Sequence, residues 1–322
     1  MPDSVEPPPP EVTAELAALS TALDQVIPDK TATNLLVATW NIRAFDRYTP
    51  TWRSVAGDSP IRDRSNIAHI AEIVSRFDVI AIQELRRSAT AFLAMLDRLG
   101  PDWAFLTSDV TEGDAGNNER LAFVYDTRRL RPSGLACELV TAPRNTELPT
   151  DGFDQFARTP YAVSFARDTT RFTLTTLHIR YGKTPADRAP ELAALAQWLA
   201  RWSAGPDPWG TNLMTLGDFN IDRRDDPLYQ AFTSTGLRPP DALNHVPRTI
   251  FDDPDPAAPP DRRHFYDQIA WFTHGRAALG GLEFVNAGTF DFTDNLIPAA
   301  TTNQLSWRIS DHYPLWSEFD VR

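Results

Sequence analysis

Two segments far apart in the chain place polar side chains beside strand-like apolar runs. Residues 216–220 read Leu-Gly-Asp-Phe-Asn, and residues 310–314 read Ser-Asp-His-Tyr-Pro. A strand end is a rigid mount, and the loop beyond it is where α/β sheets expose reactive groups. The candidates in these segments are Asp218, Asn220, Asp311 and His312. Because such side chains together suit metal-assisted attack of water on phosphate, the sequence predicts a phosphoesterase.

The same pattern recurs at four other predicted strand ends. Asn41 follows the apolar run 35–40, Glu84 follows 79–82, His178 ends the run 172–177, and Asp267 precedes the run 269–272. Any one of them is most simply a turn former or a helix cap. Their recurrence at successive strand ends instead favours one composite site.

In this order the motifs resemble the endonuclease/exonuclease/phosphatase superfamily. They read Thr-Trp-Asn-Ile at 39–42, Ile-Gln-Glu at 82–84, Leu-His at 177–178, Gly-Asp-Phe-Asn at 217–220, Tyr-Asp-Gln-Ile at 266–269 and Ser-Asp-His-Tyr-Pro at 310–314. The resemblance covers residues 39–316 and implies a four-layer α/β sandwich, with two mixed β-sheets packed face to face and helices outside. The site would lie at one rim of the sheets. Alternating hairpins and β-α pairs independently favour an α/β sandwich over a purely parallel sheet.

Within this superfamily the chain is most similar to the deoxyribonuclease I-like branch. Asn118-Glu119-Arg120 resembles a motif whose Glu pairs with the first catalytic His, and residues 156–160 resemble one whose Arg, here Arg158, contacts phosphate. Arg43 stands where the abasic-site endonucleases carry Asp, which disfavours an abasic-site repair role. Asn117 replaces an aromatic residue that lies against the DNA sugar, and residues 178–183 are unlike that branch.

The resemblance also implies roles for individual residues. His312 oriented by Asp267, and His178 oriented by Glu119, would be the acid and the base, with the order left open. Asp218 and Asn220 would position the attacking water and a phosphate oxygen. The expected metal ligands are Glu84, Asp311 and Asn41, and the expected phosphate contacts are Arg158, Arg43 and Arg86.

In the site that the resemblance implies, electrostatics favours a divalent cation. Four carboxylates converging in one cleft, those of Glu84, Asp218, Asp267 and Asp311, would repel one another and be costly to desolvate. A divalent metal relieves this repulsion, and oxygen ligands favour Mg²⁺ or Mn²⁺. Arg86 is expected to lie outside the group that holds the scissile phosphate.

The net charge of −12 bears on the substrate. Proteins that hold nucleic acid mainly by neutralising phosphates are usually basic, so the charge argues against tight, salt-resistant binding to a duplex. It does not exclude a nuclease, because bound metal offsets local negative charge. Three classes follow: a nuclease cleaving DNA or RNA, which we favour; a phosphoesterase for inositol phosphate or sphingomyelin-type head groups; and a non-catalytic scaffold.

The chain is expected to divide into a proline-rich tail with a short helix, residues 1–30, and a catalytic domain, residues 31–322. Helices are predicted at 11–27, 61–77, 88–99 and 189–202, and a surface loop at 252–261. No apolar run reaches the ~20 residues of a membrane span. No signal peptide is evident, so a cytoplasmic location is expected. The protein is also expected to be a monomer. Cys137 is predicted to be a packed core thiol, and His264 a structural or surface residue.

Overall fold

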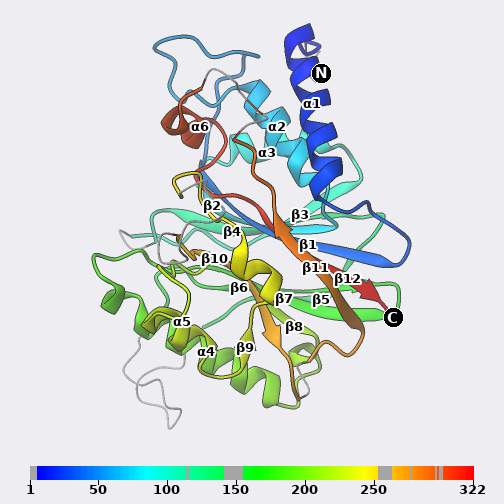
Figure 1. Ribbon diagram of the computed structural model, residues 1–322, viewed down its shortest axis with the longest axis vertical. Helices are drawn as coiled ribbons and strands as arrows, with labels where there is room; N and C mark the ends of the chain where they lie inside the picture. Colours follow the sequence, from blue (N-terminus) through cyan, green and yellow to red (C-terminus); the bar gives the residue numbers. More distant parts are fainter. Residues whose placement is uncertain are drawn as a thin grey trace.

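A computed structural model describes residues 6–113, 116–140, 155–252, 263–275, 278–293, 296 and 300–322. In this part of the chain the strands form two six-stranded sheets that pack face to face, with helices on both outer surfaces (Figure 1). The predicted four-layer α/β sandwich is therefore confirmed.

The first sheet has the order β11-β12-β1-β2-β4-β3. Its strands are β11 (Leu282–Thr289), β12 (Leu315–Val321), β1 (Asn34–Phe45), β2 (Val79–Arg86), β4 (Glu119–Asp126) and β3 (Trp103–Thr107). Only the β1–β2 pair is parallel among the pairings described in this sheet, so the sheet is mixed.

The second sheet has the order β5-β6-β7-β8-β10-β9. Its strands are β5 (Arg131–Glu138), β6 (Tyr161–Arg167), β7 (Thr170–His178), β8 (Leu213–Asp218), β10 (Asp267–Phe272) and β9 (Leu237–Arg238). Here β7 and β8 form the parallel pair, and the other described pairings are antiparallel. Each sheet thus has a central parallel pair whose carboxyl ends reach the same rim.

Helices cover the outer face of each sheet. Those of the first sheet are α1 (Pro10–Val26), α2 (Arg64–Val74), α3 (Thr90–Leu99) and α6 (Thr302–Arg308). Those of the second are α4 (Ala189–Ala204) and α5 (Pro227–Thr233). Short 3₁₀ turns lie at Pro185–Asp187, Pro208–Gly210 and Asp241–His245. Within the described residues no helix has the length and apolarity to cross a membrane.

The period of two along β1 explains the layering. Leu36 and Ala38 pack toward the helices, whereas Leu35 and Val37 pack into the core between the sheets. Both faces of this strand are buried because successive side chains point to opposite faces and each face is covered. The predicted run 35–40 is consequently buried throughout, and β1 continues past it to Phe45, with the Asn41 side chain at the rim cavity.

Several expectations differ in detail. The helix predicted at 61–77 begins at Arg64, because the Asp63 side chain accepts the Asn66 backbone N–H and caps it. Strands β3 and β11 and helices α5 and α6 were not predicted. Helix α1 packs on the body through the buried residues Leu19 and Leu23. The division at residue 30 stays a prediction, and positions 253–261 of the predicted loop lie outside the described residues.

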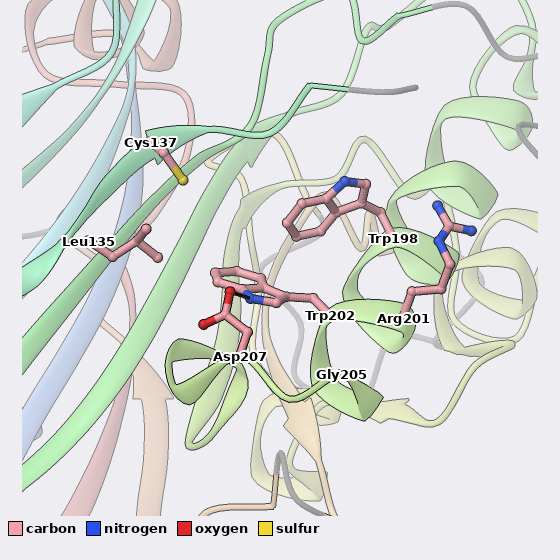
Figure 2. Close-up of a pocket in the computed structure, with 7 residues that line it drawn as sticks. All are labelled: Leu135, Cys137, Trp198, Arg201, Trp202, Gly205 and Asp207. Atoms are coloured by element: carbon pink, nitrogen blue, oxygen red, sulfur yellow. Dashed lines mark hydrogen bonds between the residues drawn. The ribbon is translucent and has the colours of Figure 1, made fainter. Parts of the chain in front are cut away.

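Cys137 is not a fully packed core thiol. It lies on the edge strand β5, half-buried, and lines a cavity of about 430 Å³ between that strand and α4 (Figure 2). Burial, with the nearby Asp207 and Glu138 carboxylates, raises the pKa of the thiol. A raised pKa lowers the thiolate fraction, so the expectation that Cys137 is no nucleophile agrees with its surroundings.

Candidate active site

The polar residues at the strand ends gather around a cavity of about 330 Å³ at the rim of the two sheets. Its lining residues are Asn41, Glu84, Asn117, Glu119, Arg158, His178, Tyr181, Asp218, Asn220, Thr249, Phe251, His264, Tyr266, Asp311 and His312. They come from both sheets and from the loops beyond them. The cavity therefore brings together most of the residues predicted from the sequence.

On the first sheet, Glu84 is positioned by an irregularity in β2. The pairing of β2 with β4 shifts register between Ile82 and Leu85, and Glu84 has a φ of 61°. A non-glycine residue with positive φ is strained, and such strain persists where the surroundings enforce it. The Glu84 carboxylate accepts a hydrogen bond of 2.7 Å from the Ala44 backbone N–H and lies 3.4 Å from Asn41 Nδ2. The local kink thus aims the carboxylate at the end of β1.

On the second sheet, strand register places three titratable side chains in a row. His178 is paired with Asp218 across β7 and β8, and Asp218 with Asp267 across β8 and β10. Gly217 permits this close approach: its φ is 147°, and a Cβ there would lie 2.2 Å from the Leu177 carbonyl oxygen. The Gly-Asp motif is therefore needed to bring these side chains together.

Two histidine–carboxylate pairs flank Asp218. His178 Nδ1 lies 2.8 Å from Glu119 Oε2, and His312 Nδ1 lies 2.6 Å from Asp267 Oδ2. The opposite ring nitrogens face Asp218 Oδ2, at 3.5 Å for His178 and 3.9 Å for His312. Each imidazole thus has one nitrogen bonded to an orienting carboxylate and the other turned toward the cavity, as proton transfer requires.

The carboxylates control the charge of both rings. Burial lowers the pKa of His178 and so does Arg158, but Glu119 and Asp218 outweigh them and the pKa is raised. Burial likewise opposes protonation of His312, yet Asp267, Asp218 and Asp311 raise its pKa well above the ordinary value. The pKa of Glu119 is lowered to about 2: burial works in the opposite direction, and His178, Arg158 and Arg86 prevail. Both imidazoles are therefore held by neighbours that favour the protonated form.

The loop carrying His312 is fixed to the end of β1. Ser310 Oγ donates to the Asn41 carbonyl at 2.6 Å and accepts the His312 backbone N–H at 3.1 Å. Trp40 Nε1 donates to the His312 carbonyl at 2.7 Å. Buried Arg62 donates to the carbonyls of Arg43, Ala44, Arg308 and Ile309. The sequence indicated Asn41 and His312, which lie at the two ends of this network. It did not identify Arg62 as the residue that joins the two segments.

The residues proposed as metal ligands fit a hard cation. Asn41 Oδ1 is buried and makes no hydrogen bond within the described structure. Glu84 and Asp311 line the same cavity, and each supplies a carboxylate. Two compact acidic and histidine groups could also hold an ion, one of Glu84, Glu119 and His178, the other of Asp218, Asp267 and His312. An orphaned amide oxygen beside carboxylates is a donor set suited to Mg²⁺ or Mn²⁺.

The three predicted phosphate-binding arginines are each paired with acidic residues of the site. Arg158 Nε lies 2.7 Å from Glu119 Oε2, and Arg43 lies 3.4 Å from Asp311. Arg86 lies 3.6 Å from Glu84 and 3.4 Å from Glu119. Arg86 thus contacts two carboxylates of the site, and its place outside the group that holds the scissile phosphate stays a prediction.

The sequence did not identify the aromatic residues of the cavity. Tyr181, Phe251 and Tyr266 line it, as does His264, which was expected to be structural or on the surface. Tyr266 directly precedes Asp267 and could have been found from that neighbourhood. Phe251 and Tyr181 lie in loops, where no periodic pattern marks a residue as facing a site.

The larger cavity beside β5 lacks comparable chemistry. Figure 2 shows Trp198 and Trp202 on α4 facing it, with the Trp202 indole N–H donating to Asp207 at 2.9 Å. Its described lining includes one carboxylate and one thiol but no histidine. The rim cavity is therefore the candidate active site.

Comparison with known proteins places the chain in a family. The sequence profile of the Endonuclease/Exonuclease/phosphatase family matches residues 38–312. A deoxyribonuclease of Thioalkalivibrio sp. (strain K90mix) is 29% identical over 217 residues, which are 65% of this chain and about half, 52%, of that protein. Deoxyribonuclease-1 of Bos taurus is 27% identical over 290 residues, 88% of this chain and 91% of that one.

The fold is shared with solved structures as well. A conserved protein of unknown function from Enterococcus faecalis V583 superposes with a TM-score of 0.57 at 17% identity, covering 89% of this chain and 100% of the other. At this level of identity the similarity concerns the fold alone. It matches the two packed sheets described above.

Proposed function

The chain belongs to the endonuclease/exonuclease/phosphatase family, whose members hydrolyse phosphate esters, and we propose that it is a divalent-metal-dependent phosphodiesterase cleaving nucleic acid. The observation that carries the proposal is the pair of histidine–carboxylate couples whose free ring nitrogens both face Asp218. In-line displacement at a diester needs a base for the water and an acid for the leaving oxygen. Two such couples on opposite sides of one carboxylate supply both.

The two imidazoles and the three carboxylates beside them have different proposed roles. One imidazole takes the proton of the attacking water, and the other gives a proton to the leaving oxygen, each transfer being worth ~10²–10⁴-fold. Glu119 and Asp267 hold the two rings in orientation through their Nδ1 atoms. Asp218 orients the water, and its Oδ1 accepts the Asn220 backbone N–H at 2.9 Å, which fixes the turn beyond β8.

Metal and arginine complete the site. Glu84, Asp311 and Asn41 would hold a divalent cation, which neutralises charge developing on the phosphate. Arg158, near both Glu119 and the His178 carbonyl, is positioned to bind a non-bridging phosphate oxygen. Arg43 lies beside Asp311 and Arg86 beside Glu84, and both arginines would bind negative charge of the substrate near the metal.

Nucleic acid is the substrate class that the relatives favour, since two of them are named deoxyribonucleases. One observation favours a second candidate, a phosphoesterase for small or lipid head groups. The net charge is −12, and each arginine proposed to bind phosphate is already paired with a carboxylate of the site. Few positively charged side chains at the rim are thus left to contact the successive phosphates of a long nucleic acid.

A substrate panel tests the proposal. Purified protein is incubated with single-stranded DNA, plasmid, RNA, inositol phosphates and sphingomyelin, each with Mg²⁺, Mn²⁺ or EDTA. We expect metal-dependent cleavage of nucleic acid with retention of the fold in EDTA. Hydrolysis of a head-group phosphate without cleavage of any nucleic acid would support the second candidate instead.

A further inference from the structure

We propose that Tyr181, Phe251, Tyr266 and His264 form an aromatic wall that stacks an unpaired nucleobase next to the scissile phosphate, so that the enzyme acts on single-stranded nucleic acid in preference to duplex. This inference rests on the proposed function and specifies its substrate. Base–aromatic stacking tolerates any sequence, because every base has a π-face. A base held inside a duplex could not reach such a wall.

The rings line one cavity together with His312, and Tyr266 contacts that histidine. Tyr266 lies between two imidazoles, with centroids 5.7 Å from His312 and 4.6 Å from His264, the latter ring stacked at 25°. Burial and the neighbouring Tyr181 hydroxyl raise the pKa of Tyr266, so these two side chains lie close to each other. The aromatic wall therefore starts one ring away from the His312 imidazole, where a nucleotide attached to the bound phosphate would place its base.

The exposure of its side chains distinguishes the aromatic wall from part of a hydrophobic core. Tyr181 is 59% exposed and Phe251 is 53% exposed, although both line the catalytic cavity. Single exposed apolar side chains are common on protein surfaces, whereas several that share one cavity mark a binding site. Two such rings beside the same catalytic cavity point to a flat apolar ligand group.

The loop that carries Tyr181 is pre-organised. The Asp187 carboxylate accepts the backbone N–H groups of Lys183 and Thr184 at 2.9 and 2.8 Å. Gly182 has a φ of 65°, and a Cβ there would lie 2.7 Å from Asp187 Cβ, so the tight turn requires glycine. A loop ordered before binding loses less conformational entropy when the ligand arrives.

Arg188 ties this loop to the catalytic strand end. Its guanidinium lies 5.1 Å from the centre of the Tyr181 ring and donates to the Asn220 carbonyl at 2.7 Å. Two further hydrogen bonds, of 2.9 and 2.8 Å, hold it to the Asp222 carboxylate. The ring of Tyr181 is thereby placed relative to Asn220 rather than left free to move in solvent.

Phe251 is held in place through Thr249, which is bridged to His312. Thr249 forms a β-bridge with His312, and its hydroxyl accepts the Phe251 backbone N–H at 3.3 Å. His264 Nδ1 lies 2.7 Å from an Asp252 carboxylate oxygen. Both sides of the aromatic wall are thus attached to residues that contact the catalytic histidine or its neighbours.

Charge explains why stacking would be needed. Duplex binding relies on many phosphate contacts, and the chain has a net charge of −12. Arg180 and Lys183 are exposed on either side of Tyr181, and they could contact the phosphates of one strand. Stacking adds binding that does not depend on neutralising phosphates and therefore persists as salt is raised.

The test uses a single-stranded oligonucleotide whose linkages are all methylphosphonate except one central phosphodiester. It is prepared with normal bases and, separately, with abasic residues on both sides of the cleavable linkage. We expect kcat/KM to be about tenfold or more higher with bases, the size expected for one stacked base. Tyr181→Ala should remove most of this difference, Tyr181→Leu should do the same, and Tyr181→Phe should keep it. Phe105→Ala, a change at an exposed ring on β3, is the matched control and should keep the full difference.

Binding separates this inference from the proposed function. Fluorescence anisotropy of the labelled oligonucleotides in EDTA reports stacking without turnover, and base-dependent affinity lost in Tyr181→Ala would support the wall even if no oligonucleotide were cleaved. Equal cleavage and equal binding with and without bases would overturn it while leaving the nuclease proposal intact. An equal loss on both substrates in Tyr181→Ala would also overturn it, since the residue would then act on the phosphate or the fold.

Discussion

The side-chain amide of Asn41 donates a 3.0 Å hydrogen bond to Asp218 Oδ2, and this bond joins the two sheets at the rim that carries the site. Asn41 lies in the buried part of β1, and Asp218 is the last residue of β8. The same oxygen of Asp218 faces both His178 and His312, which we propose to be the catalytic histidines. The residues proposed to hold metal and those proposed to move protons therefore form one connected network.

Because Asp218 lies at the centre of this network, we expect Asp218→Asn to lower kcat by at least ~10²-fold. The substitution keeps the shape of the side chain but removes the charge that orients water and faces both imidazoles. The measurement is steady-state turnover of the cleaved substrate, together with thermal unfolding to show that the fold persists.

Asp168→Asn is the matched control for this change. Asp168 is exposed, lies in the turn between β6 and β7, and has a φ of 52°, which asparagine accepts readily. It should retain wild-type turnover. Near-normal turnover of the Asp218 variant would show that this carboxylate has only a minor role.

A second prediction concerns the metal. Chelation should abolish hydrolysis, and Glu84→Gln should reduce Mn²⁺ affinity by about tenfold or more, because a charged ligand beside the orphaned Asn41 Oδ1 becomes neutral. Isothermal titration with Mn²⁺ measures the affinity apart from turnover. Glu112→Gln alters an exposed carboxylate paired with Arg87 and should bind Mn²⁺ like the wild type. Full activity in EDTA would contradict the metal assignment.

The layering of the fold was predictable because the local signals agree with one another. The apolar runs of β1, β2 and β8 are buried on both faces, so each was recognisable as a strand that ends in a polar residue. Strand β3 was missed because it is only partly buried and its apolar run, Trp103 to Leu106, is too short to tell a strand from a helical turn. Strand β11 was missed because Glu283 and Asn286 interrupt its apolar residues. A short strand at or near a sheet edge is defined by its neighbour, which the local sequence does not show.

The sequence predicted which residues belong to the site better than it predicted the contacts that they make. Asn41, His178 and Asp218 could be identified from position and residue type, but Arg86 could not be placed, because its contact with Glu84 depends on the kink in β2. The aromatic residues of the loops could not be identified either. Tyr181 reaches the cavity through a turn fixed by Gly182, and such a turn leaves no periodic signal.

A third prediction links a buried histidine to acid stability. His69 on α2 is fully buried, its ring nitrogens make no hydrogen bond within the described structure, and Nε2 lies 3.6 Å from a Glu15 carboxylate oxygen. Burial, aided by Arg53, lowers its pKa from 6.5 to about 4. The unfolded chain therefore binds this proton first, and the stability contributed by neutral His69 is present above pH 6.5 and lost as pH falls toward 4. One pKa unit is about 1.4 kcal/mol, so roughly 3 kcal/mol is involved.

We expect His69→Leu to flatten the fall in the free energy of unfolding between pH 6.5 and 4. Urea denaturation at a series of pH values measures it. His245→Leu, a change at an exposed histidine, should keep the wild-type pH dependence. An unchanged slope in the His69 variant would mean that other groups account for the acid sensitivity.

The last prediction uses pH to test the two proton-transfer pairs. Both imidazoles have raised pKa values, so the bell-shaped profile of kcat/KM should have its maximum above pH 6.5. Glu119→Gln removes the negative charge that raises the pKa of His178, so the limb reporting His178 should move to lower pH. The rising limb will move if His178 is the base, and the falling limb if it is the acid. Asp267→Asn makes the equivalent change beside His312 and should move the other limb in the same direction. Because each carboxylate contacts only one of the two rings, a profile in which both limbs move in either variant, or neither moves, would contradict two separate pairs.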